Sequence, residues 1–171
     1  LLCSTLIRFM LEDMSSLLLR LMHRSTLGAV CLALAAAGSV AAPQLQPYRV
    51  EGQAIEQSLG PPGDAARGRA LLIARDPANC ILCHAAPTEL VGAGARFSGN
   101  LAPPLDGAGA RWTAGQLRLR IVDSRRLNPD SLMPSYYRTD GLVEVGAPWR
   151  GQPIMSAQQI EDLIAYLVTL R

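Results

Sequence analysis

The chain has 171 residues, which predicts one domain with additional segments. Its formal net charge of +2 is too small to indicate a nucleic-acid partner or an anionic membrane surface. All 16 basic residues are arginine. No strand pattern of any length occurs, so we expect an all-α protein.

The first 41 residues are typical of a leader that is removed on export. Met22-His23-Arg24 supplies a positive start, Leu27 to Ala37 an apolar core, and Ser39-Val40-Ala41 the small residues that a signal peptidase recognises. We expect a periplasmic protein with cleavage after Ala41 in preference to Ala42, which Pro43 follows directly. Met22 is the expected true start of translation, and residues 1–21 would result from a misplaced start codon. An uncleaved membrane anchor is the weaker interpretation, because charged residues interrupt the apolar sequence.

Residues 42–63 are rich in Pro, Gly and Gln and predict an extended N-terminal arm that wraps either the domain or a partner. The domain itself is expected over residues 64–171. Asp64 is a typical N-cap and predicts a helix from Ala65 to about Arg75. Gly68 inside this helix is less favourable than alanine, so close packing against another helix is the expected reason for it.

The next segment is Asn79-Cys80-Ile81-Leu82-Cys83-His84, and its Cys-x-x-Cys-His pattern is the attachment signature of a c-type haem. Each sulfur forms a thioether with a porphyrin vinyl group, and His84 ligates the iron. One helical turn carries Cys80 and Cys83 on the same face and presents the next residue to the ring centre. We therefore expect one covalently attached haem c.

Two other interpretations of Cys-x-x-Cys are weaker. A thioredoxin-like redox pair occurs in a βαβ context, which this sequence does not predict. A zinc site needs further Cys or His ligands. Once the leader is removed, Cys80, Cys83 and His84 are the only cysteines and the only histidine, so none remain for zinc, for a disulfide or for nucleophilic catalysis.

Residues Ala85 to Ala110 predict a long glycine-containing loop, which could fold over the edge of a covalently held haem and use the haem as its core. A capping box in Thr113-Ala114-Gly115-Gln116 then predicts a helix that runs to about Ser124. Arginines cluster around this helix, and a solvated face, haem-propionate pairing and partner docking all remain open for them. They are Arg118, Arg120, Arg125 and Arg126.

The second iron ligand is expected to be a methionine, because no second histidine remains. Only Met133 and Met155 follow the leader. Met155 precedes the capping box of Ser156 to Gln159 and can pack on Ile160 as a hydrophobic staple. Met133 lies in a loop that Pro134 keeps extended, so Met133 is the favoured ligand. The alternative is that Met133 fills core space and another group or water binds the iron.

After an irregular stretch over Ser135 to Pro153, a final helix is predicted from Ala157 to Leu170. This order of features resembles the class I cytochromes c. In that family the first and last helices cross at a glycine and an aromatic residue, here Gly68 and Tyr166. The resemblance also implies supporting roles for Pro103, whose carbonyl would hold the ligand histidine, and for Leu105. Ala102 stands before Pro103 where the family usually has glycine.

A closer resemblance covers the chain from about Gly63 to its end. It is to the SoxX family, the mono-haem subunits of SoxAX sulfur-oxidation cytochromes. The segments that carry it are Gly99-Asn100-Leu101-Ala102-Pro103-Pro104-Leu105, Arg111-Trp112, Gln116 to Asp123, Asn128-Pro129-Asp130-Ser131-Leu132-Met133-Pro134-Ser135-Tyr136-Tyr137-Arg138 and Ala157 to Asp162.

The resemblance implies a periplasmic heterodimer with a SoxA-type haem protein. Such a pair acts as an L-cysteine S-thiosulfotransferase, which couples thiosulfate oxidatively to a cysteine of a SoxYZ-type carrier and passes electrons to a downstream cytochrome acceptor. The catalytic cysteine is expected on the partner and no catalytic residue on this chain, which would relay electrons. The alternative is a free-standing periplasmic electron shuttle, for which the arm and the stretch Ser135 to Pro153 would be unneeded.

Overall fold

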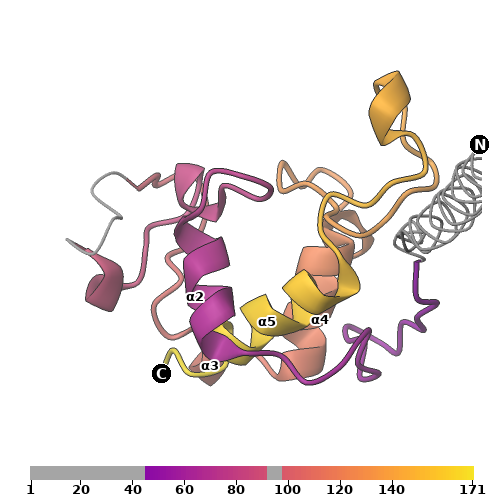
Figure 1. Cartoon of the computed structure of the whole chain (residues 1–171). Helices are drawn as coiled ribbons and strands as arrows, with labels where there is room; N and C mark the ends of the chain where they lie inside the picture. The colour runs from indigo at the N-terminus through magenta and orange to yellow at the C-terminus, as the bar shows by residue number, and fades with distance from the viewer. Residues whose placement is uncertain (1–44, 92–97) are drawn as a thin grey trace, which may run out of the picture. The chain divides into compact units, whose positions relative to one another are not determined.

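A computed structural model describes residues 45–91 and 98–171 of the chain. The leader and its cleavage site, the start of the arm and residues 92–97 of the long loop lie outside the described residues. The described ranges contain two isolated β-bridges and no strand, which confirms the all-α expectation. None of the helices in these ranges is long and apolar enough to cross a membrane. The helices are α2 (Ala65–Ile73), α3 (Ala108–Arg111), α4 (Ala114–Val122) and α5 (Ala157–Leu167), with short 3-10 turns between them (Figure 1).

The three longer helices begin where the sequence predicts. The Asp64 carboxylate accepts a hydrogen bond from the Arg67 amide at the start of α2, and Thr113 and Ser156 form reciprocal capping boxes at the starts of α4 and α5. Their ends come two or three residues earlier than predicted, at Ile73, Val122 and Leu167. The predicted long loop also contains α3 and a 3-10 turn, which the sequence analysis did not anticipate.

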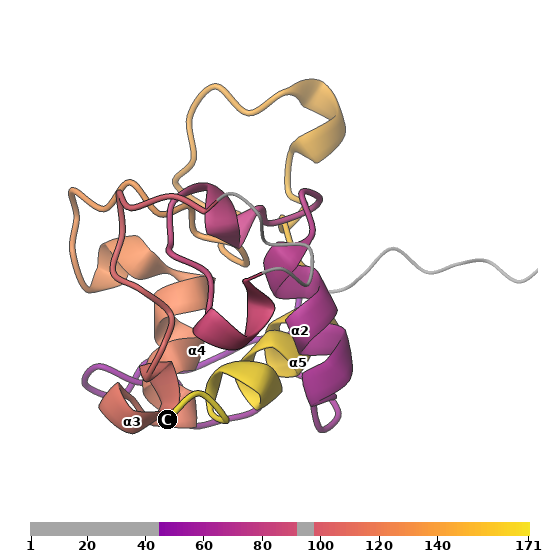
Figure 2. The ribbon, with the colours of Figure 1, turned by 90° about the vertical axis from the view of Figure 1, so that its left-hand side faces the viewer.

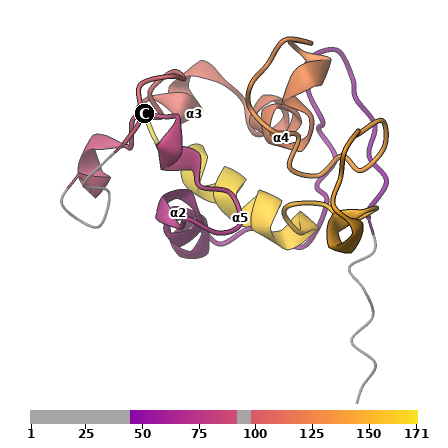
Figure 3. The same ribbon diagram turned by 90° about the horizontal axis from the view of Figure 1, so that it is seen from above.

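Helices α2 and α5 cross at close range (Figures 2 and 3). A Cβ atom on Gly68 would collide with the backbone carbonyl of Asp162, so glycine is required at this crossing. Tyr166, one turn further along α5, is buried and donates a hydrogen bond from its hydroxyl to Glu89 at 2.6 Å. The expected crossing of the first and last helices is therefore present, and its glycine acts by allowing the two backbones to approach.

The N-terminal arm packs on its own domain. Ile55 and Leu59 are 0% and 3% exposed and belong to the main hydrophobic core. Arg118 of α4 donates to both carboxylate oxygens of Glu161 on α5, each at 2.8 Å, and to the Ile55 carbonyl at 2.6 Å. The Leu59 amide donates to the same carboxylate at 3.0 Å. This buried ion pair therefore joins α4, α5 and the arm.

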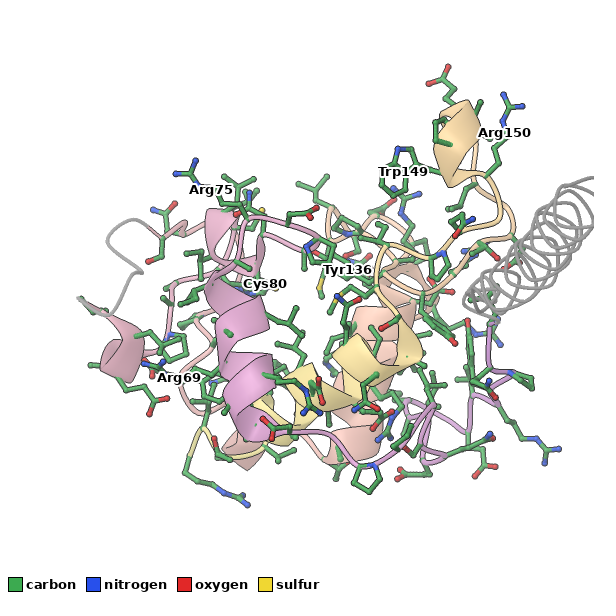
Figure 4. The ribbon with its side chains drawn as sticks, viewed as in Figure 1. Arg69, Arg75, Cys80, Tyr136, Trp149 and Arg150 are labelled. Carbon is green, nitrogen blue, oxygen red and sulfur yellow. The ribbon has the colours of Figure 1, made fainter. Side chains whose placement is uncertain are left out.

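The stretch between the methionine loop and α5 is largely exposed. The 3-10 turn Ala147–Trp149 projects away from the helices in Figures 1 and 2. Val143 and Trp149 are 86% and 67% exposed. Trp149 and Arg150 lie on opposite sides of this projection in Figure 4. This insertion, residues 140–152, thus adds little to the core of the domain, unlike Tyr136 and Tyr137 before it, which are buried in the core.

Candidate functional site: a haem cavity

A cavity of about 440 Å³ lies between α2 and α4, with α5 as its floor. This volume falls in the range of about 300–1,000 Å³ typical of cofactor sites. In Figure 4, Cys80 lies on the α2 side of this space and Tyr136 on the α4 side. Most of the lining is apolar, and Leu72, Ile121, Leu163 and Leu167 contribute to it from the three helices. The predicted site residues Cys80, Cys83, His84, Pro103, Leu105 and Met133 all line this one cavity.

The His84 ring is oriented by a backbone carbonyl. Its Nδ1 atom lies 2.7 Å from the carbonyl oxygen of Pro103. A carbonyl oxygen can only accept, so Nδ1 carries the proton and the lone pair of Nε2 is free for a metal. The same hydrogen bond raises the donor strength of the imidazole and fixes its plane. The expected pairing of His84 with Pro103 is thus present in the structure.

Backbone hydrogen bonds bring Pro103 to His84. The segment 99–105 lies along 81–85, with the amides of Gly99, Ala102 and Leu105 donating to the carbonyls of Ile81, Cys83 and Ala85 at 2.8, 3.0 and 3.2 Å. A Cβ atom on Gly99 would collide with the Leu82 carbonyl, so this approach requires glycine. Ala102 is half-buried at this position, and its amide makes one of these three bonds.

The two cysteines lie on a 3-10 turn, Cys80–Leu82, and on the residue that follows it. Asn79 precedes them with a left-handed backbone (φ 49°), a conformation that asparagine adopts more readily than most residues. Burial raises the pKa of the Cys80 thiol to about 11. A redox-active Cys-x-x-Cys pair needs the opposite shift, toward the thiolate. The raised pKa of Cys80 is therefore evidence against the thioredoxin-like interpretation.

Met133 reaches the cavity from the loop after α4 and is half-buried there. Met155 does not line the cavity. It is 0% exposed and packs in the core immediately before α5, as the hydrophobic staple predicts. Of the two methionines in the described residues, only Met133 lines the cavity together with the two cysteines and His84.

Tyr136 connects the two sides of the cavity, and sequence reasoning assigned it no role. Its hydroxyl donates to the carbonyl of Ala78, just before the haem motif, at 3.0 Å. Burial raises the pKa of Tyr136, with the nearby Cys80 as a smaller cause, so its hydroxyl remains a donor at neutral pH. A buried tyrosine usually finds such a partner, but the sequence does not say which one.

The arginines around α4 have separate roles. Arg118 is buried in its pair with Glu161, and Arg120 packs on the Trp112 ring at 4.5 Å. Arg125 and Arg126 are exposed. None of the four lines the cavity, and the solvated-face interpretation is wrong for Arg118.

The donor set and the cavity fit a haem c: two thiols on one turn, an imidazole with a free Nε2, a thioether, and an apolar space between them. Residues 65–171 match the family model of cytochrome c. The chain belongs to the cytochrome c family.

A search of curated proteins finds no match for this cytochrome c. Among solved structures, it is similar to the crystal structure of SoxXA from P. pantotrophus. The two are 38% identical with a TM-score of 0.66, over 75% of this chain and 96% of that chain. This similarity confirms the resemblance to the SoxX family. The protein is thus an electron-transferring haem subunit with one covalently attached haem c, and this function is favoured over a free-standing shuttle.

Proposed function

We propose that this cytochrome c relays electrons in a periplasmic SoxAX-type complex. Cys80 and Cys83 would hold the haem through thioether bonds, with His84 and Met133 as the axial iron ligands. The observation that carries this assignment is that all four side chains line the same apolar cavity. When bound, the haem supplies one-electron chemistry, since its iron can be ferric or ferrous.

The chain's own residues would set the conditions for that chemistry. The Pro103 carbonyl holds the Nδ1–H of His84, which leaves Nε2 as the metal-binding atom. The apolar side chains of α4 and α5 limit the access of water. Ligation by histidine together with methionine raises the reduction potential, which suits a subunit that accepts electrons from sulfur chemistry.

The reaction we propose for the complex joins thiosulfate to the thiol of a SoxYZ-type carrier protein. One S–S bond forms, and one proton and two electrons are released. The electrons would pass through this subunit to a downstream cytochrome. In the described residues the only thiols are those of the haem motif, which supports a reacting cysteine on a SoxA-type partner. The similarity to a SoxXA structure also supports such a partner.

The test is to isolate the haem-bearing species from the periplasm of thiosulfate-grown cells. We expect a stable complex with a second haem protein, whose haems become reduced when thiosulfate and the carrier are added together. Carrier alone and thiosulfate alone serve as controls. A lone monomer that exchanges electrons but does not respond to thiosulfate would contradict the proposal.

A further inference from the structure

The C-terminal end of α4 holds the backbone of the loop that carries Met133. The last carbonyls of a helix have no partner inside the helix. Here the Tyr136 amide donates to the Ile121 carbonyl at 3.0 Å, and the Tyr137 amide donates to the Val122 carbonyl at 3.3 Å. The chain after Met133 is therefore attached along the end of the helix.

Two side chains that follow α4 complete this attachment. The Ser124 hydroxyl donates to the carbonyl of Met133 itself at 2.6 Å. The Ser135 hydroxyl donates to the Asp123 carboxylate at 2.8 Å. Asp123 and Ser124 are only 8% and 7% exposed, and neither lines the haem cavity. They contact Met133 and Ser135, on both sides of Pro134, from outside the cavity.

The rest of the loop has little to hold it. Asn128, Pro129 and Asp130 are exposed, and Leu132 is 79% exposed. The bonds within it are short-range, such as the one from the Met133 amide to the Ser131 hydroxyl at 3.2 Å. A loop of this kind could move away from the cavity unless its end were fixed to a rigid element.

We infer that Asp123 and Ser124 are positioning residues for the axial methionine, which keep the Met133 thioether on the iron by fixing the backbone on both sides of Pro134. This inference rests on the proposed ligation by Met133. Because the Met133 carbonyl is bonded to Ser124, directly after α4, the backbone from which the Met133 side chain extends is held in place. Loss of that bond would leave iron ligation unchanged in kind but would increase the fraction of time in which the thioether is displaced.

The test uses the full-length, haem-loaded protein and the binding of imidazole to its ferric form. Imidazole can bind only when the thioether leaves, so its binding measures displacement. One lost hydrogen bond shifts such an equilibrium by about two- to tenfold. We expect imidazole affinity to rise by that factor in Ser124→Ala and in Ser135→Ala, and to return towards the original value in Ser124→Thr, which keeps a hydroxyl donor.

Two control variants separate positioning from general stability. Ser58→Ala removes a serine hydroxyl that donates to the Gly60 carbonyl in the exposed arm. Ile55→Val removes a buried methyl group near Gly115, at the other end of α4, and weakens the core. We expect both to bind imidazole as the unmodified protein does. If Ile55→Val raises imidazole affinity as much as Ser124→Ala does, the positioning role is overturned.

Met133→Ala separates the ligation of the iron by Met133 from the positioning role of Asp123 and Ser124. We expect it to bind imidazole without any competition from a protein ligand. If it does so while Ser124→Ala and Ser135→Ala behave as the unmodified protein, the positioning role is wrong and the ligation stands. If Met133→Ala leaves the spectrum and the imidazole affinity unchanged, the ligation itself is wrong and the inference fails with it.

Discussion

The two sides of the haem cavity are built in different ways. On the histidine side, Cys80, Cys83 and His84 lie within one five-residue segment, and three backbone hydrogen bonds attach the segment 99–105 to it. On the methionine side, Met133 comes from a loop much later in the chain and is held by hydrogen bonds to the end of α4.

This difference assigns different tasks to the two sides. The histidine side is local, so its geometry depends mainly on the motif and on one glycine-dependent contact at Gly99. The methionine side depends on how α4 is placed relative to α5, which the buried Arg118–Glu161 pair fixes. We therefore expect substitutions on the histidine side to decide whether haem is kept, and those on the methionine side to change its properties.

The largest effect is expected for the double substitution Cys80→Ala and Cys83→Ala. Both thioether bonds would be lost, so acidified acetone should extract all of the haem, whereas none should leave the unmodified protein. Met133→Ala is the matched variant from the other side of the cavity and should retain its haem in the same extraction. Covalent haem in the double variant would show that the attachment site lies elsewhere.

Met133→Ala should change the iron without releasing the haem. We expect a lower reduction potential, because the thioether favours the ferrous state. We also expect complete loss of the ferric absorption band of methionine-ligated haem, because the sulfur ligand is absent. Potentiometric titration and the visible spectrum measure this. Met155→Leu conserves volume in the core, so it should keep the potential and cost less than about 1.5 kcal/mol of unfolding free energy. Equal potentials in the two variants would refute the assignment.

Glu161→Ala tests what holds the two sides together. It leaves the Arg118 guanidinium buried without its partner, and removing one member of a buried pair costs about 3–5 kcal/mol of unfolding free energy. Urea unfolding followed by circular dichroism measures the change. Glu144→Ala, at an exposed position in the insertion, should change the free energy by less than about 0.5 kcal/mol. A similar small effect in both would mean that the pair does not join α4 to α5 energetically.

The smallest effect is expected from pH, through Asp162 at the crossing of α2 and α5. Hydrogen bonds from the Arg67 guanidinium at 2.7 and 2.8 Å lower the pKa of Asp162 to about 2. An aspartate in an unfolded chain has a pKa of about 3.9. The folded pKa is the lower one, so this group stabilises the fold above about pH 4 and ceases to do so as the pH falls towards 2.

Asp162→Asn should therefore lower stability by about 1–2 kcal/mol at neutral pH and have less effect below pH 3. Urea unfolding at a series of pH values measures both. Glu51→Gln, at an exposed position, should leave the pH profile unchanged. A constant difference between Asp162→Asn and the unmodified protein at every pH would argue against this role for the Asp162 charge.

The sequence alone determined what depends on short-range chemistry. Cys80 to His84 carry the haem motif, and Asp64, Thr113 and Ser156 begin their helices because a side-chain oxygen satisfies free amides one turn ahead. The prediction that Met133 and not Met155 lies at the site also came from local context, since a residue before a helix cap has a packing role of its own. Each of these features depends on neighbours within a few residues.

Only the tertiary structure decided how distant groups meet. Arg118 looked like part of a solvated cluster, and its burial depends on Glu161 and the Ile55 carbonyl, which lie far away in the sequence. The sequence also did not predict the hydrogen bond from the Tyr136 hydroxyl to the Ala78 carbonyl or the one from the Ser124 hydroxyl to the Met133 carbonyl. Hydroxyl and guanidinium groups can bond to many partners, so their sequence positions do not specify which one the fold provides.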